Sequence, residues 1–432
     1  MKKIFACLLA GLLALSSLSA CNNSSTESSG SGDGSSTAGD DSQGSGETVE
    51  LEFVQQKREA TETFDKVIEE FQAAHSNIVV KQNTVPDAGQ VLMSRAASNT
   101  LPDLMTHWPG DANFTAFCEE GKIIDITDAD FVSNIDESYV NGILQDGKLY
   151  CIPVALNFMG VWYNVDKFTE AGYEIPQTWD EMIEIAKDIQ SKGDGDYAFV
   201  LPDKDTWTID QCLSNIYGKS LQDYTIQDIY DAVGAGEKTF ADYPELVDAA
   251  EKAIELREYS NGDTLSLGYD AAVSEFATGT GYMFPQGSWV YASLKSANPD
   301  GNFAMFTMPN DDGDMRQPMG VDLAIAGSTN TAHEDEVMEF LAFMASKEGA
   351  QKYSELDGSP SCVNGVESNL DYASDILDTF AENGELSVSF RPGTYQDDYR
   401  AETQGLLMDK DVEGWIATVT QVFKDNYAEA NG

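Results

Sequence analysis

The sequence predicts an α/β protein whose folded body is divided between two lobes. Strand-like and helix-like segments alternate in its first part, and a second α/β region follows Tyr150. The roughly 380 residues after the N-terminal segments are too many for one hydrophobic core. Alternating strands and helices favour βαβ units on a mostly parallel sheet, so we expect two α/β units that each have a sheet.

The first α/β region opens with residues 48–54, where apolar and polar side chains alternate as in a half-buried strand. Helical spacing then relates Phe64, Val67 and Phe71, which predicts an amphipathic helix. The expected continuation is a strand at 78–85, a helix at 91–97, a strand at 101–106 and a helix that contains Phe114 and ends at Gly121.

The second region contains a helix with a clear start signal. In Thr178-Trp179-Asp180-Glu181 the side chains of Thr178 and Glu181 can each accept a hydrogen bond from the other residue's amide, as in a capping box. Ile183, Ala186 and Ile189 supply the apolar face, and Gly193 ends the helix. Further helices are expected at 246–259, 270–277, 334–345 and 415–427.

The N-terminus is a targeting segment that precedes the fold. Residues 1–20 have two lysines followed by an apolar run too short to span a bilayer, which predicts a signal peptide. Leu18-Ser19-Ala20-Cys21 resembles the bacterial lipobox, which implies that Cys21 is lipidated; the alternative is an ordinary signal peptide with a chance cysteine. Residues 21–48 are rich in Ser and Gly and predict a flexible tether. We therefore expect a lipid-anchored protein on the outer face of the cytoplasmic membrane.

The charge and the few histidines and cysteines limit the kinds of molecule and ion that the protein is expected to bind. The chain has 74 acidic and 25 basic residues, a formal charge of −49, which disfavours nucleic acid, anionic lipid surfaces and strongly anionic ligands. Solubility alone is the alternative reason for this charge. Three histidines and widely spaced cysteines give no metal-site pattern, and we expect no metal and no cofactor. Buried free thiols are the expected state of Cys118, Cys151, Cys212 and Cys362.

Motifs of the common enzyme classes are missing from the sequence. It has no G-x-S-x-G elbow, no phosphate-binding glycine loop with lysine and no H-E-x-x-H pair. We therefore expect a binding protein that is not an enzyme.

A series of sequence blocks resembles family 1 of the extracellular solute-binding proteins, which serve carbohydrate ABC importers and include maltose-binding protein. The blocks occur in the family's order and cover most of the body, which makes the resemblance more specific than any one block. They are 101–105 with 121–127, 147–153, 163–168 with 178–181, 276–289, 308–309, 320–322 and 336–345.

The resemblance implies a two-lobe periplasmic-binding-protein-like fold with a hinge and an interlobe ligand cleft. The first lobe is expected to comprise residues 49–156 and 320–366, and the second 157–319 and 367–432. The implied function is capture of a sugar or short oligosaccharide and its delivery to the ABC permease subunits in the membrane. A monomer is expected. The region 194–240 and the loop at 107–111 depart from maltose-binding protein, which leaves the identity of the sugar open.

Aromatic rings cover the C–H faces of sugars, while carboxylates, amides and Arg bind the hydroxyls, and both should stand at strand ends that face the cleft. The loop after the third strand, a segment after the first strand and a Trp after Gly287 match places where the family contacts ligand. For the tryptophans, core packing is the alternative interpretation. The predicted ligand-binding residues are Gln56, Lys57, Arg58, His107, Trp108, Asp111, Asn157, Trp207, Trp289, Asp322 and Tyr395.

Two other functions compete with sugar import. A receptor for a polyamine or peptide would suit the acidic charge balance. A secreted glycoside hydrolase would share a Trp-rich cleft, but it needs two carboxylates about 5–10 Å apart across the scissile bond.

Overall fold

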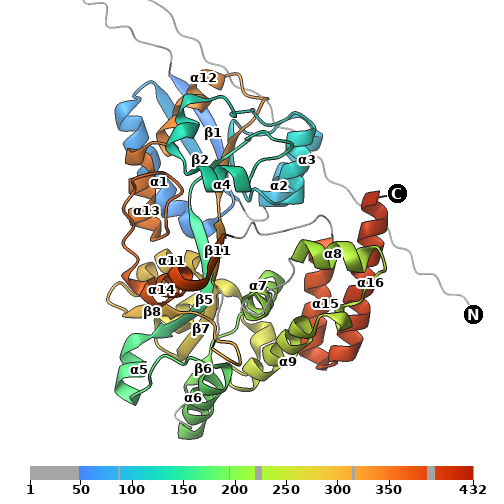
Figure 1. The fold of residues 1–432 in the computed structure, drawn as a ribbon. Helices are drawn as coiled ribbons and strands as arrows, with labels where there is room; N and C mark the ends of the chain where they lie inside the picture. The colour runs from blue at the N-terminus through green and yellow to red at the C-terminus, as the bar shows by residue number, and fades with distance from the viewer. Residues whose placement is uncertain are drawn as a thin grey trace, which may run out of the picture. The chain divides into compact units, whose positions relative to one another are not determined.

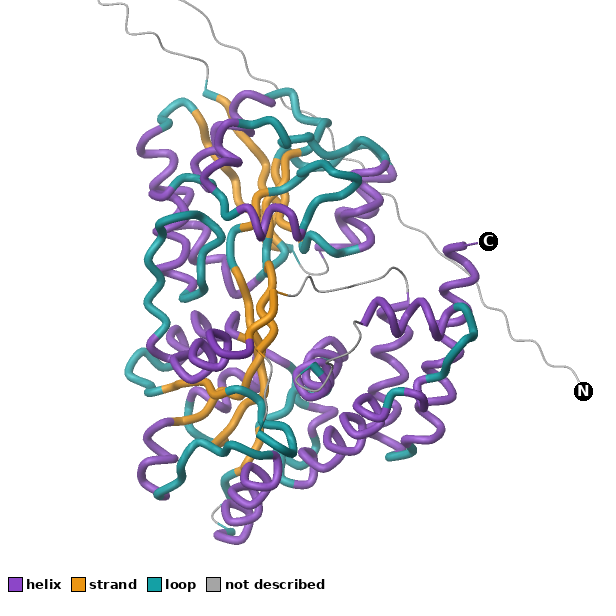
Figure 2. The backbone as a smooth tube through the Cα atoms, in the orientation of Figure 1, coloured by secondary structure: helices purple, strands orange, loops and turns teal. Residues whose placement is uncertain are grey.

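The computed structural model describes residues 48–85, 88–193, 195–218, 226–313, 317–386 and 395–431 (Figure 1). The predicted signal peptide, Cys21 and nearly all of the predicted tether lie outside these residues. Within them the strands form two sheets that run through the middle of the folded body, with helices on both sides (Figure 2). No helix in the described ranges is long and apolar enough to cross a membrane.

The first sheet has the described strands in the order β2 (Ile78–Thr84), β1 (Val49–Gln55), β3 (Leu104–His107), β10 (Ala324–Gly327) and β4 (Ile152–Pro153). Strand β1 pairs in parallel with β2 and β3, as the βαβ pattern predicts. Strand β10 is antiparallel to β3 and β4. The helices of this part are α1 (Thr61–Ala74), α2 (Ala88–Ala97), α3 (Ala112–Glu119), α4 (Glu137–Gly142), α12 (Glu334–Met344) and α13 (Lys347–Asp357).

The second sheet has the described order β11 (Gly384–Leu386), β9 (Gln317–Val321), β5 (Leu156–Asn164), β7 (Gly281–Gly287) and β6 (Tyr197–Phe199), and β8 (Phe303–Phe306) also pairs with β5. Antiparallel pairs dominate around β5, which is antiparallel to β7, β8 and β9. The reason is connectivity: the chain enters this sheet along β5 and leaves it along β9, so the two strands run in opposite directions.

Helices surround the second sheet, and several of them form a helical layer beside it. They are α5 (Val165–Ala171), α6 (Trp179–Lys192), α7 (Thr206–Tyr217), α8 (Ile226–Gly234), α9 (Pro244–Glu258), α10 (Tyr269–Ala277), α11 (Tyr291–Ala297), α14 (Ser374–Asn383), α15 (Tyr395–Asp409) and α16 (Val412–Asn431). Strand β5 runs from the part of the molecule with β1 and β2 towards the part with β6 and β7 (Figure 1).

The cap of α6 differs slightly from the expected capping box. The Thr178 hydroxyl accepts a hydrogen bond from the Glu181 amide at 3.3 Å, as predicted. The Glu181 carboxylate, however, accepts from the amide of Gln177 at 2.7 Å, one residue before Thr178. Gly193 ends the helix with a φ of +67°, a left-handed conformation that glycine adopts at low cost.

Three described chain segments cross between the sheets side by side. The Val154 amide donates to the Leu323 carbonyl, and the Asp322 amide donates to the Ala155 carbonyl, both at 2.9 Å. The Leu156 amide donates to the Pro360 carbonyl at the same distance. The boundaries of the two lobes stay a prediction, which this narrow bundle of crossings supports.

The buried apolar side chains form two clusters. One surrounds the first sheet and continues into the second through residues such as Phe276, Trp289 and Phe303. The other lies among α6, α7, α8, α9, α15 and α16. The thiols of Cys118, Cys151, Cys212 and Cys362 are buried, and the structure joins none of these four in a disulfide.

Candidate functional site

The segment that follows β1 lies beside the end of β3, because the two strands are parallel neighbours. The Gln56 amide nitrogen donates to the Thr106 hydroxyl at 2.8 Å, and its side chain donates to the Thr106 carbonyl at 2.6 Å. Arg58 is exposed and forms an ion pair with Asp270 at 3.2 Å. Gln56 thus fixes the segment in place, and Arg58 reaches the surface.

Lys57 instead turns inward and meets the crossing segments. Its Nζ lies 2.8 Å from Asp322 and 3.7 Å from Asp357, the last residue of α13. The Asn157 side chain donates to the other Asp322 oxygen at 3.1 Å. The Lys57 side chain is 4% exposed and that of Asp357 is 1% exposed. We call Lys57, Asn157, Asp322 and Asp357 the charged cluster.

The electrostatics of the charged cluster favour a protonated lysine. Burial opposes the ammonium form of Lys57, but the carboxylates of Asp322 and Asp357 outweigh it and raise the pKa of Lys57 well above its ordinary value. Burial and the Asp357 carboxylate together raise the pKa of the neighbouring Tyr353 hydroxyl. The cluster therefore keeps Lys57 protonated beside Asp322 and Asp357 near neutral pH.

The end of β3 and the loop that follows it were predicted to face the ligand. The three predicted residues there differ in their exposure and in their contacts. His107 is 2% exposed, and its ring stacks on Phe114 at a centroid distance of 5.1 Å, which is the environment of a core side chain. Its Nδ1 accepts a hydrogen bond from the Trp108 amide at 3.1 Å. Trp108 is half-buried, and the Asp111 carboxylate caps α3 by accepting from the Asn113 amide at 2.9 Å. Trp108 is therefore the ring of this loop that stays partly exposed.

Three aromatic residues gather in the part of the molecule with the second sheet. Trp207 is the second residue of α7, Tyr269 is the first of α10, and Trp289 lies in the helical turn Ser288–Val290 after β7. The Trp207 ring lies 4.9 Å from the Tyr269 ring at 60° and 6.4 Å from the Trp289 ring at 53°. We call Trp207, Tyr269 and Trp289 the aromatic cluster.

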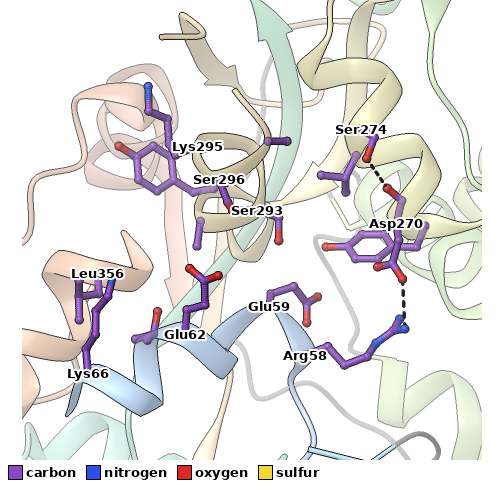
Figure 3. Close-up of a pocket in the computed structure, with 16 residues that line it drawn as sticks. Arg58, Glu59, Glu62, Lys66, Asp270, Ser274, Ser293, Lys295, Ser296 and Leu356 are labelled. Carbon is purple, nitrogen blue, oxygen red and sulfur yellow. Dashed lines mark hydrogen bonds and ion pairs between the residues drawn. The ribbon is translucent and has the colours of Figure 1, made fainter. Parts of the chain in front are cut away.

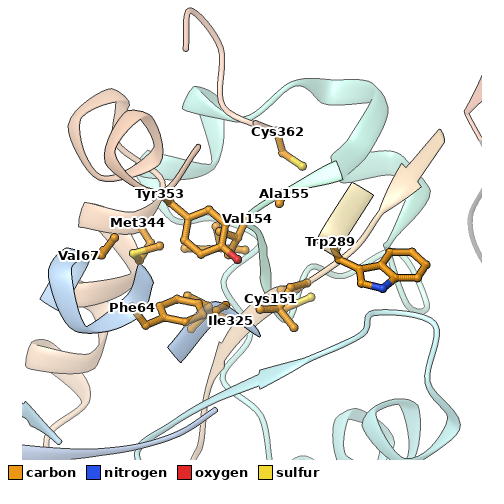
Figure 4. Close-up of a cluster of buried hydrophobic side chains, with 14 of the residues drawn as sticks. Phe64, Val67, Cys151, Val154, Ala155, Trp289, Ile325, Met344, Tyr353 and Cys362 are labelled. Atoms are coloured by element: carbon orange, nitrogen blue, oxygen red, sulfur yellow. The ribbon is translucent and has the colours of Figure 1, made fainter. Parts of the chain in front are cut away.

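Trp289 has a polar atom that the described residues do not satisfy. The residue is 9% exposed, and its indole Nε1 is buried with no hydrogen-bond partner among those residues. Figure 4 shows its indole directed away from the core side chains Phe64 and Tyr353. A buried donor without an acceptor costs about 1–3 kcal/mol, so the atom is a natural contact for a ligand oxygen.

The two clusters are neighbours along β5. The Phe158 amide, next to Asn157, donates to the hydroxyl of Ser288, next to Trp289, at 3.3 Å. The pairing of Met159 with Gly287 continues this contact. From the predicted set, the structure thus places Lys57 and Asn157 against Asp322, and Trp207 beside Trp289.

The remaining predicted residues lie away from the two clusters, or have side chains outside the described part of the structure. His107 ends β3, Trp108 and Asp111 follow it in the β3–α3 loop, and Arg58 is at the surface. Tyr395 begins α15, but its side chain is outside the described part of the structure. Asp357 and Tyr269 were not predicted, because each has the sequence context of an ordinary helix-end residue. In the described residues, no group of three or more His, Cys, Asp or Glu side chains could hold a metal ion.

The amino-acid sequence is similar to a family of bacterial solute-binding proteins and to individual sugar-binding proteins. The sequence model described as "Bacterial extracellular solute-binding protein" matches residues 57–351. The multiple sugar-binding protein of Streptococcus mutans serotype c is 27% identical over 98% of both chains. The melibiose/raffinose/stachyose-binding protein MelE of Bacillus subtilis is 23% identical, covering 73% of this chain and 74% of its own.

Solved structures share the fold. RafE in complex with raffinose has a TM-score of 0.76 at 24% identity and covers 88% of this chain and 100% of its own. A sugar transporter of Bacillus licheniformis in complex with stachyose has a TM-score of 0.70 at 20% identity, with the same coverage. These likenesses confirm the predicted two-lobe α/β fold.

Proposed function

This chain belongs to the family of bacterial extracellular solute-binding proteins, and we propose that it captures a sugar or short oligosaccharide for an ABC importer. In this role it holds the sugar between its lobes and delivers it to the permease subunits in the membrane. The lobes are residues 49–156 with 320–366 and residues 157–319 with 367–432, and they close around the ligand by bending at the crossing segments.

The observation that carries this proposal is the environment of Trp289. A large ring beside a second indole offers a flat apolar platform for the C–H face of a sugar. The buried Nε1 adds a donor that a sugar hydroxyl can satisfy. The names of the relatives support the same class of ligand, since they include binding proteins for multiple sugars and for melibiose, raffinose and stachyose.

The charged cluster argues against a polyamine as the ligand. A polycation is bound by acidic side chains without a cation of their own, but Asp322 and Asp357 share the Lys57 ammonium, which lies 2.8 Å from the first and 3.7 Å from the second. The second Asp322 oxygen accepts from Asn157. A neutral ligand with many hydroxyls requires no such free carboxylate, which favours a sugar.

Titration calorimetry of the full-length chain with raffinose, stachyose, spermidine and a tripeptide tests the ligand class. We expect heat of binding with at least one of the two sugars and none with spermidine or the tripeptide. Binding of spermidine or the tripeptide without binding of either sugar would overturn the proposal.

Binding without turnover is the second part of the proposal. The full-length chain incubated with raffinose should leave the sugar intact, and mass spectrometry of the mixture measures this. Cleavage products that depend on the protein would identify a hydrolase instead.

We further propose that Cys21 carries a lipid that anchors the mature monomer outside the cytoplasmic membrane. The support is the lipobox-like segment before the Ser/Gly-rich residues. Cys21→Ala should move the protein from the membrane fraction to the soluble fraction. Equal membrane retention of both forms would contradict the anchor.

A further inference from the structure

Tyr269 is the member of the aromatic cluster that also lines a cavity with residues of α1, and the described residues contact it at several points. The residue is 2% exposed and begins α10. Its backbone amide donates to the Asp205 carboxylate at 2.6 Å. Asp205 is the residue immediately before α7, and Trp207 is the second residue of that helix. One carboxylate thus ties the start of α10 to the start of the helix that carries Trp207.

The ring of Tyr269 approaches Trp207 in a favourable geometry. Its centroid lies 4.9 Å from the Trp207 ring, and the planes meet at 60°, an edge-to-face arrangement. Trp207 itself is only half-buried, so the core does not enclose its indole on all sides. A half-buried side chain keeps access to several rotamers unless a neighbour restricts it. Tyr269 is a rigid, buried neighbour that can do this.

Tyr269 is also held from the first-lobe side. A cavity of about 500 Å³ lies between the start of α1 and helices α10 and α11, and Tyr269 is part of its wall. Figure 3 shows Arg58 reaching Asp270 across one side of this cavity, with Glu59 beside it. Burial and then the Glu59 carboxylate raise the pKa of Tyr269 well above its ordinary value. The phenol therefore stays neutral and packed at this boundary.

We propose that Tyr269 is a positioning residue, whose ring holds the Trp207 indole in the orientation that a sugar face requires. The positioning itself is a property of the protein without ligand, whereas its value for affinity rests on the proposed function. Both can be measured, and the two measurements separate a failure of the inference from a failure of the proposed function.

The first experiment needs no ligand. The chain contains six tryptophans, so 5-fluorotryptophan labelling gives six ¹⁹F resonances, and Trp207→Phe assigns that of Trp207. Tyr269→Leu, which keeps apolar volume but removes the ring, should shift or broaden the Trp207 resonance. Tyr269→Phe keeps the ring and should restore it. Trp179 and Trp415, which belong to the other apolar cluster, should not change in either variant. An unaltered Trp207 resonance in Tyr269→Leu would overturn the inference.

The second experiment is a double-mutant cycle with raffinose as the probe. Because an aromatic pair contributes about 0.5–1.5 kcal/mol beyond its buried area, Tyr269→Leu should weaken binding about two- to tenfold. In a Trp207→Ala background the same change should have no further effect. Tyr230→Leu is the matched control, a buried tyrosine in the other apolar cluster, and should leave affinity unchanged.

The outcomes of the cycle differ for the two hypotheses. Losses from Tyr269→Leu and Trp207→Ala that simply add would overturn a role that acts through Trp207. Wild-type protein that binds neither raffinose nor stachyose would count against the proposed function, while the ¹⁹F measurement would still decide the positioning of Trp207.

Discussion

The charged cluster and the aromatic cluster both lie beside β5, but they differ in whether their polar side-chain atoms have partners within the protein. In the charged cluster Lys57 contacts Asp322 and Asp357, and Asn157 contacts the remaining oxygen of Asp322. In the aromatic cluster the rings pack on one another, while Trp289 Nε1 has no acceptor among the described residues. The charged cluster thus pairs the Lys57 ammonium with side chains of the protein itself, whereas the aromatic cluster leaves a ring face and a donor for a ligand.

This difference assigns separate roles to the two clusters. Charged groups in a buried site require partners in every state of the protein, whether or not ligand is bound. Here those partners come from two of the segments that cross between the sheets, which carry Asn157 and Asp322, and from Asp357 at the end of α13. We infer that the charged cluster mainly holds the hinge together, whereas the aromatic cluster mainly recognises ligand. Four substitutions test this division, in order of decreasing expected effect.

Lys57→Met should destabilise the protein by about 3–5 kcal/mol, because it leaves two buried carboxylates without their cation. Denaturant unfolding measures the loss. The double variant Lys57→Met with Asp322→Leu should recover part of it. A loss below about 1 kcal/mol would mean that the cluster does not stabilise the hinge.

The pH dependence of this variant has a defined sign. The pKa of Lys57 is raised in the folded state, so its stabilising contribution is fully present below the ordinary value of 10.5 and is lost only as the pH rises through the folded value. The difference in stability between wild type and Lys57→Met should therefore be constant between about pH 6 and pH 9.

Trp289→Ala should weaken sugar binding by about 2 kcal/mol or more, roughly thirtyfold, because it removes the platform. Calorimetry with raffinose measures the affinity, and denaturant unfolding measures the stability. Since Trp289 is 9% exposed and packs in the first apolar cluster, some loss of stability is expected as well. Unchanged affinity with a stability loss of about 3–5 kcal/mol would make Trp289 a core residue alone.

Trp289→Phe isolates the donor from the ring. The variant keeps an aromatic face but removes Nε1, so affinity should fall by about 0.5–1.5 kcal/mol while the platform remains. The unfolding free energy without sugar should fall less than in Trp289→Ala, because Phe keeps most of the packed ring and leaves a smaller cavity. Equal affinity in Trp289→Phe and wild type would show that Nε1 does not contact the sugar.

Glu59→Gln should have the smallest effect, and its sign depends on pH. Burial raises the pKa of Glu59 even though Lys57 opposes the rise, so the folded state binds this proton more tightly than the unfolded chain. The stability this gives is present below the ordinary value of 4.5 and is lost as the pH rises through the folded pKa. Glu59→Gln should therefore raise the melting temperature near pH 7 and lose this advantage near about pH 4.

Glu62→Gln is the control for Glu59→Gln, since it removes the same charge from an exposed position of α1. A shift in melting temperature for Glu59→Gln that does not change with pH would contradict the proposed cost of the half-buried carboxylate.

The sequence predicted the helices best where local signals mark their ends. Thr178 and Gly193 bound α6 as expected, because a cap and a left-handed glycine act within one turn. The helix expected at 415–427 extends over Val412–Asn431, since its apolar face stops before its backbone does. The antiparallel direction of β5 relative to β9 could not be predicted from local sequence patterns, because it depends on where the chain crosses between the sheets.

The site shows the same limit at the level of single residues. Lys57 and Asp322 were predicted separately as ligand contacts, but they are 265 positions apart, and no local pattern indicates that they bind each other. Asp357 is buried where the end of α13 meets Lys57, a contact between residues 300 positions apart that its own sequence context does not indicate. His107 was expected at the ligand, yet all four residues of β3 are buried, which places its ring in the core.

The position of β10 also determines when the first sheet can form while the chain is being synthesised. This strand inserts between β3 and β4 in the first sheet, although more than 150 residues of the second sheet and its helices separate it from β4. A nascent chain that ends before Ala324 therefore has every other described strand of its first sheet but still exposes the edges of β3 and β4. Completion of the first sheet must therefore wait for β10, which follows most of the second sheet in the chain, so the first sheet cannot be finished before that part of the second has been synthesised.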